Sequence, residues 1–166
     1  MKDLLAIFLL FLASNAFANR IIVGKDKAIT TLREGIKTAK DGDTIMLNKG
    51  VYKEGNIIID KAIYLIGIGD PVLDGENKNE IITLTGRNIV IKSIHFVNAG
   101  YSSMNDYAAL KIIDATSVVI ENNDFNNTFF AIHVANSTYS VIRNNTIKGN
   151  DKSEHLSGNG IHLWKC

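Results

Sequence analysis

The middle of the chain repeats itself at a fixed interval, and this repeat constrains the fold more than any other feature. Residues 110–112 (Leu-Lys-Ile) return as residues 132–134 (Ile-His-Val), at an offset of 22 (132 − 110). Residues 119–125 return at the same offset as residues 141–147, so that Val-Ile-x-Asn-Asn occurs twice. Ile-His-Val returns once more as Ile-His-Leu at residues 161–163, at an offset of 29 (161 − 132). A period of this length is typical of one turn of a solenoid.

The residue types within each repeat favour strands and tight turns. The chain of 166 residues contains 24 isoleucines and 18 asparagines but only one proline. Isoleucine is favoured in strands, whereas asparagine tolerates left-handed turns. The apolar runs are too short and too often interrupted for a helical period. We therefore predict an all-β fold, a right-handed parallel β-helix with about 22 residues per turn.

Stacking of successive turns would place equivalent residues above one another. Parallel strands lie ~4.8 Å apart, and alternate residues of a strand point to opposite faces. Four columns are predicted to point inward and to form one core: Leu110, Ile132 and Ile161; Ile112, Val134 and Leu163; Ile91, Ile120 and Ile142; and Phe96, Phe125 and Ile147. Nearer the N-terminus, residues 57–59 and 63–67 are expected to align with residues 82–84 and 90–91 at an offset of 25 (82 − 57).

Paired asparagines recur at residues 122–123 and 144–145, at the corner between two strands. Asn126, Asn136 and Asn144 also match the glycosylation acceptor sequence. Because the pairs recur with the period of the turn, side-chain amides that bond from one turn to the next are the favoured interpretation. We expect no glycans at these positions.

The first 18 residues have the pattern of a secretory signal peptide. A basic start and an apolar run lead to residues 16–18 (Ala-Phe-Ala), a small-x-small cleavage site, so cleavage is expected before Asn19. A membrane anchor is the alternative, although the run is short for a membrane-spanning helix. Export to the periplasm would leave Cys166 as the single cysteine and would exclude an internal disulfide.

Residues 19–42 are predicted to form a short strand and an amphipathic helix ahead of the solenoid at residues 43–166. Thr31 and Glu34 form a Ser/Thr-x-x-Glu capping signature, and Gly42 follows the end of the apolar pattern. A helix at this place would cover the open first turn, because a solenoid exposes apolar surface at its ends. Glu34 is therefore interpreted as a capping residue and not as a catalytic acid.

Alternation along the repeated strands points two histidines away from the core. His133 and His162 each lie between two inward residues, and Lys111 takes the equivalent place one turn earlier. The two imidazoles are expected on neighbouring strands about 5 Å apart. Continued alternation places Trp164 and Cys166 on the side of His162. A cluster of His133, His162 and Cys166 would suit a soft or borderline metal ion such as copper.

The alternative for this column is a solvated face that binds no metal, because the three residues do not reproduce a known ligand spacing. His95 also lies between two inward residues, Ile94 and Phe96, and is interpreted as an exposed strand residue.

Two of the repeats gain seven residues (29 − 22) at the same corner of the turn. The insertions are residues 98–108, with Tyr101, Asp106 and Tyr107, and residues 149–159, with Glu154 and His155. The intervening repeat lacks an insertion, so the two loops would flank a shallow trough beside His133. Loops on a rigid scaffold commonly carry binding sites, so these residues, with Lys111 and Trp164, are the candidates for binding. Tolerated insertions without function are the alternative.

Several segments resemble the NosD family of β-helical accessory proteins. They are residues 42–45 (Gly-Asp-Thr-Ile), residues 50–52 (Gly-Val-Tyr), the Val-Ile-x-Asn-Asn repeats and, most specifically, residues 158–166 (Gly-Asn-Gly-Ile-His-Leu-Trp-Lys-Cys). The resemblance covers about residues 29–166. It implies a periplasmic protein that works with a membrane ATP-driven transporter and assists assembly of the copper-sulfur centre of nitrous oxide reductase. Family members are longer, so we expect this chain to be an N-terminal fragment.

Three functional hypotheses remain open. The first is a non-enzymatic docking or binding scaffold, and a net charge of +1 argues against a nucleic-acid partner. The second is a polysaccharide-binding or polysaccharide-cleaving β-helix, in which Trp164 and the tyrosines stack on sugars. Such enzymes need converging acidic groups, and Asp114, Asp124 and Arg143 fall at different positions of the repeat, so an enzyme is ranked second. The third is an inactive fragment.

Overall fold

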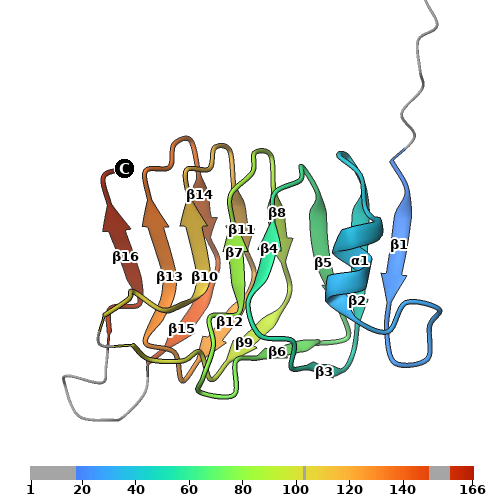
Figure 1. Ribbon diagram of the computed structural model, residues 1–166, viewed down its shortest axis with the longest axis horizontal. Coiled ribbons are helices and arrows are strands. Elements are labelled where there is room, and N and C mark those ends of the chain that lie inside the picture. Colours follow the sequence, from blue (N-terminus) through green and yellow to red (C-terminus); the bar gives the residue numbers. More distant parts are fainter. Residues whose placement is uncertain (1–17, 103, 150–157) are drawn as a thin grey trace, which may run out of the picture.

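The computed structural model describes residues 18–102, 104–149 and 158–166. Within these ranges the chain forms a stack of parallel strands, with one short helix near the N-terminal end of the stack (Figure 1). Each complete turn contributes one strand to each of three sheets. This confirms the predicted parallel β-helix and is compatible with the right-handed coil expected from the sequence.

The three sheets run along the length of the stack. The first sheet consists of β1 (Arg20–Val23), β2 (Thr44–Asn48), β5 (Tyr64–Ile68), β8 (Val90–Lys92), β11 (Val119–Glu121) and β14 (Val141–Arg143). The second consists of β3 (Val51–Tyr52), β6 (Val72–Asp74), β9 (His95–Val97), β12 (Asp124–Asn126) and β15 (Thr146–Lys148). The third consists of β4 (Ile57–Ile59), β7 (Ile82–Leu84), β10 (Ala108–Ile113), β13 (Phe130–Ala135) and β16 (Ile161–Trp164).

The register of the strands confirms all four predicted inward columns. Ile132 pairs with both Leu110 and Ile161, and the other three columns align in the same way. The predicted offset of 25 for the turns nearer the N-terminus was partly wrong. Ile57 pairs with Ile82 as predicted, but Leu65 pairs with Ile91, an offset of 26 (91 − 65). The reason is the turn before β8, residues 85–89, which has one residue more than the turn before β5, residues 60–63.

The inward columns form one apolar core along the axis of the stack. Isoleucine and leucine fill most of it, and Phe96 and Phe125 are its largest buried side chains. Their rings lie 5.0 Å apart at an interplanar angle of 10°. An aromatic pair of this kind contributes about 0.5–1.5 kcal/mol beyond the area that it buries. The stack therefore reinforces the contact between β9 and β12.

Asparagine amides bond from turn to turn, which supports their structural interpretation. The Asn123 side chain is buried; it accepts from the Ile94 N–H at 3.1 Å and donates to Asn145 Oδ1 at 3.1 Å. Asn123 also donates to Ile91 O at 3.1 Å, and Asn145 repeats this bond one turn later by donating to Ile120 O at 2.8 Å. Asn122 precedes the buried amide with a φ of 54°, in the left-handed region that asparagine tolerates. Each amide thus joins its corner to backbone of the preceding turn, the Ile94 N–H at the equivalent corner and Ile120 O within β11.

Helix α1 (Leu32–Thr38) lies where the capping signature predicts it. Thr31 Oγ1 accepts from the Glu34 N–H at 3.2 Å, which confirms the N-cap. The carboxylate of Glu54 adds a cap that the sequence did not reveal, because it accepts from the N–H groups of Leu32 at 2.7 Å and Arg33 at 2.9 Å. The helix packs against β1 and β2, at the end of the stack where the first turn begins (Figure 1).

The predicted signal peptide falls largely on residues 1–17, which lie outside the described residues. In the ranges that the structure covers, no helix is both long enough and apolar enough to cross a membrane.

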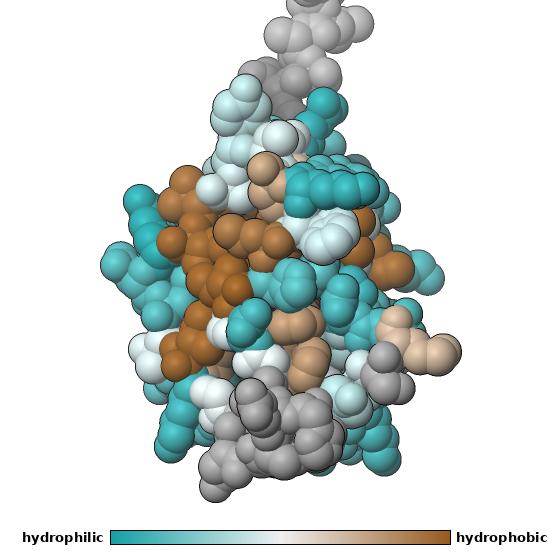
Figure 2. All heavy atoms as spheres, turned by 90° about the vertical axis from the view of Figure 1, so that its left-hand side faces the viewer, coloured by the Kyte–Doolittle hydropathy of each residue, from teal (hydrophilic) through white to brown (hydrophobic). Residues whose placement is uncertain are grey.

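Apolar side chains are exposed at the end of the stack that carries β14, β15 and β16. Figure 2 looks onto this end and shows a hydrophobic surface running across it. Val141, Ile161, Leu163 and Trp164 are between 40% and 62% exposed. Ile142 and Ile147, which continue two of the inward columns, are partly buried.

Candidate functional site

The outward side of the third sheet carries the histidine column. Lys111, His133 and His162 are aligned on β10, β13 and β16, as the repeat predicts. The rings of His133 and His162 lie 5.0 Å apart with an interplanar angle of 27°, close to the expected spacing. The column continues toward the N-terminus with Thr83.

His133 is buried, whereas the alternative interpretation of the histidine column predicted a solvated face. Its side chain points away from the core, yet the residue is only 5% exposed. The ring of Phe130 is responsible in part, because it lies 6.1 Å from the ring of His133 and 4.6 Å, edge to face, from that of His162. An outward position on this sheet is therefore not a solvated one, because neighbouring aromatic side chains cover it.

The histidine pair carries unsatisfied polar atoms. Nδ1 of His133 and Nδ1 of His162 are both buried and have no hydrogen-bond partner among the described residues. A buried polar atom without a partner costs about 1–3 kcal/mol. Burial, and then the proximity of His162, lower the pKa of His133 below its ordinary value. The lowered pKa favours neutral His133, in which one ring nitrogen carries a lone pair that a ligand can use.

Charged groups beside the pair are largely balanced. Lys111 Nζ lies 2.7 Å from Glu80 Oε1, and both side chains are mostly buried. Glu80 also accepts from the Asn56 amide at 3.3 Å. Asp106, from the first insertion, acts on His133 electrostatically and opposes the lowering of its pKa. Lys111 is thus part of a structural ion pair and not a free cation.

An aromatic cluster extends from the pair toward the first insertion. The Tyr101 ring lies 5.1 Å from that of Phe129, and the Phe129 ring lies 4.5 Å from that of Phe130. Tyr101 was predicted from the sequence, whereas Phe129 and Phe130 were missed. The sequence does contain a feature that could have revealed them. Two consecutive aromatic residues stand at the corner where the neighbouring turns have insertions. We call Tyr101, Phe129, Phe130, His133 and His162 the aromatic face.

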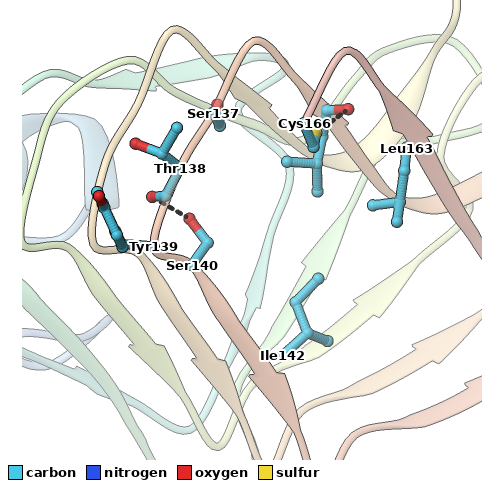
Figure 3. A pocket seen from close by; sticks show the side chains of 8 residues that line it. Ser137, Thr138, Tyr139, Ser140, Ile142, Leu163 and Cys166 are labelled. Atoms are coloured by element: carbon cyan, nitrogen blue, oxygen red, sulfur yellow. Dashed lines mark hydrogen bonds between the residues drawn. The ribbon is translucent and has the colours of Figure 1, made fainter.

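Cys166 does not join the histidines, which corrects the predicted three-residue cluster. Lys165 has a φ of 51°, so the chain leaves the extended conformation after β16 and the alternation ends. Cys166 Sγ lies 3.5 Å from Val134 O. It lines an apolar hollow of about 610 Å³ together with Val134, Leu163 and other residues (Figure 3). Within the described ranges, no group of three or more His, Cys, Asp or Glu residues could hold a metal ion.

The other predicted site residues are dispersed. Trp164 is 57% exposed on β16, and Tyr107 is half-buried beside β10. Glu154 and His155 lie outside the described residues, so the predicted trough between two loops is not defined by the structure. His95 is half-exposed on β9, with Nε2 at 3.6 Å from Asp70 Oδ1. The Arg143 guanidinium pairs with Glu121 at 2.6 Å.

Comparisons with protein-family models, with curated proteins and with solved structures find no match to this chain.

Proposed function

We propose that this protein is a non-enzymatic periplasmic scaffold that docks partner proteins during assembly of the copper-sulfur centre of nitrous oxide reductase. The observation that carries the proposal is the aromatic face, in which Tyr101, Phe129 and Phe130 adjoin a stacked histidine pair. The NosD resemblance at residues 158–166 supplies the partners, namely the reductase and a membrane ATP-driven transporter.

The composition of the aromatic face suits a docking surface. The cores of protein interfaces are enriched in aromatic residues and poor in charged ones. Phe130, His133 and His162 lie on strands that are fixed by the core. Ring contacts connect Phe129 to Phe130 and Tyr101 to Phe129, so binding would immobilise few further side chains and lose little entropy. A net charge of +1 gives weak long-range attraction to any partner. Affinity would then depend on short-range contacts of the aromatic side chains.

We propose that the histidine pair would bind copper. Imidazole nitrogens are ligands that copper accepts, and Nδ1 of His133 and Nδ1 of His162 have no hydrogen-bond partner in the part of the chain that the structure describes. The fit is partial, because the described residues bring no third His, Cys, Asp or Glu to the pair. The pair would therefore supply two ligands, and a docked partner would supply the others.

Replacing Tyr101 and Phe129 by alanine tests the docking role. We expect the dissociation constant for purified nitrous oxide reductase lacking its copper-sulfur centre to rise at least about tenfold, which corresponds to 1.4 kcal/mol. Surface plasmon resonance measures the effect. Tyr139→Ala is the matched control, because Tyr139 is 87% exposed in the turn after β13 and belongs to no aromatic cluster in the described residues. Equal affinities of all variants would contradict the proposal. Glycan binding that Trp164→Ala abolishes would favour the polysaccharide hypothesis instead.

Removal of the two histidines tests the copper site. In a Cys166→Ser background, which removes the competing thiol, we expect His133→Ala or His162→Ala to weaken binding of monovalent copper at least about tenfold. Anaerobic titration against a chromophoric chelator measures it. His95→Ala serves as the control, because His95 lies half-exposed on another sheet. Unchanged binding in both histidine variants would exclude copper at this pair while leaving the docking test unaffected.

A further inference from the structure

A buried carboxylate lies at the beginning of the first solenoid turn. Asp43 is 3% exposed and immediately precedes β2. Its two oxygens accept separate backbone hydrogen bonds, Oδ1 from the Asn19 nitrogen at 2.8 Å and Oδ2 from the Lys40 nitrogen at 2.8 Å. The Lys40 and Asn19 N–H groups hold the pKa of Asp43 below its ordinary value, so the group is ionised at neutral pH. In the described part of the chain no salt bridge joins it to a side-chain cation.

Asn19 is fixed in front of this carboxylate by the first sheet. Its carbonyl oxygen accepts from the Thr44 N–H at 2.9 Å, and the next residue, Arg20, pairs with Thr44 in the ladder between β1 and β2. The nitrogen that contacts Asp43 belongs to the peptide bond between Ala18 and Asn19. The small-x-small pattern of residues 16–18 predicts cleavage at that same bond.

We propose that removal of the signal peptide turns the Asn19 nitrogen into an α-ammonium group that forms an ion pair with Asp43 and fastens β1 to the first turn. Hydrolysis breaks the C–N bond between Ala18 and Asn19. Water supplies the hydroxyl that completes the Ala18 carboxyl group and a hydrogen to the Asn19 amine, which then takes up a proton from solvent. The inference rests on the predicted cleavage position and needs no docking partner, so it extends beyond the proposed function.

The ion pair would strengthen a contact that already exists. A peptide N–H donates one hydrogen bond without a net charge, whereas an ammonium group has three donors and a full positive charge. Because Asp43 is ionised, the existing N–H bond is already charge-assisted. The ammonium group adds the Coulombic attraction between two opposite full charges. The fold has already removed Asp43 from water, so its desolvation is not an added cost of pairing. The processed chain is therefore expected to hold β1 more tightly than the precursor does.

The test compares two chains that differ by one residue. The protein exported to the periplasm is purified, and its first residue is determined by mass spectrometry, with Asn19 expected. A second form retains Ala18, which carries the ammonium group away from Asp43. At pH 7 the folding equilibrium constant of the chain that begins at Asn19 should be at least about tenfold larger, equivalent to one unit of pKa shift. An unchanged folding constant, or a different first residue, would overturn the inference.

The pH dependence identifies the group responsible. Pairing raises the pKa of the α-amino group above its ordinary value of about 7.7–8.0. The added stability is then complete below that range and is lost as the pH rises through the raised value. Asp43→Asn should abolish the difference between the two chains, and persistence of the difference would overturn the pair. If Asp43→Asn does not fold, NMR titration of the α-amino group in the unsubstituted chain decides instead, and an ordinary pKa would overturn the inference.

Discussion

At the scale of single residues, the buried polar side chains determine how the turns of this solenoid join. Asn123 is 3% exposed, and its amide joins its own turn to the preceding one, through the Ile94 N–H and Ile91 O, and to the following one, through the Asn145 side chain. Of the backbone groups that it contacts, the Ile94 N–H lies at the corner between β8 and β9, whereas Ile91 O lies within β8. A buried group that loses such a partner cannot turn to water instead.

Asn123→Ala should therefore destabilise the protein strongly. We expect a loss of about 1–3 kcal/mol in the free energy of unfolding for each buried group left without a partner. Urea unfolding monitored by circular dichroism gives the value. Asn126→Ala is the matched control on the same turn, because Asn126 is exposed, and its effect should stay within about 0.5 kcal/mol. Similar losses in both variants would argue against the amide contacts as the cause.

The asparagine contacts could be predicted because the same side chain recurs at the same place in each turn. The Asp43 and Glu54 contacts could not. Each of them joins a turn to a segment outside the repeat, residue 19 for Asp43 and helix α1 for Glu54. A periodic pattern gives no information on a bond that occurs once, so these partners emerge only from the folded arrangement.

At the scale of elements, close packing of the corners limits which residues a strand can contain. Gly67 lies in β5, and a Cβ atom added there would be 1.9 Å from Ser93 O and 2.9 Å from Pro71 Cγ. The contact with Ser93 involves backbone of the next turn, which cannot move without displacing β8. The absence of a side chain at residue 67 therefore allows two turns to approach each other.

Gly67→Ala should disrupt this approach. Overpacking typically costs about 1–3 kcal/mol, and we expect the upper end of that range or more, because the obstacle is backbone. Thermal unfolding reports the change. Gly149→Ala provides the comparison, since a Cβ atom at Gly149 would meet no atom of the described residues within 4 Å. A Gly67 variant as stable as the Gly149 variant would mean that the corner adapts more freely than its packing indicates.

The strands and their register could be predicted because alternation and period act together on many residues. The failures have local causes. The shielding of His133 depends on Phe130, whose ring position is not encoded in the period-two pattern. The Cys166 side chain departs from the predicted side because Lys165 has a left-handed conformation. Lysine does not predict such a conformation from sequence. The second departure separates Cys166 from the predicted three-residue metal cluster, whereas the first leaves the histidine pair in place but covers it.

At the scale of the whole molecule, each turn is stabilised mainly by its immediate neighbours. β10 pairs with both β7 and β13, and its side chains are mostly buried. β14 and β15 pair on one side and show mostly exposed positions. The fold class followed from the repeat alone, because a period near 22 leaves few other architectures. The proposed function was less predictable, because the aromatic face includes Tyr101 and Phe129, which have no counterparts in the neighbouring turns.

Hydrogen exchange should reveal this gradient of stability along the stack. We expect the amides of β7, β10 and β11 to exchange at least about tenfold more slowly than those of β14, β15 and β16, because local opening requires less free energy where fewer contacts must break. Mass spectrometry or NMR resolves the segments. Uniform protection across all turns would indicate a single cooperative unit and contradict the expectation.

The bond from Asn123 to Asn145 spans 22 residues and begins and ends on the same kind of side chain. A gene segment that encodes one such interval could be copied in tandem, and the new turn would find a matching amide on either neighbour. The number of turns that the gene encodes could then change by whole turns without loss of this contact. The insertion between β9 and β10 can change independently, since it lies at another corner and does not interrupt this contact.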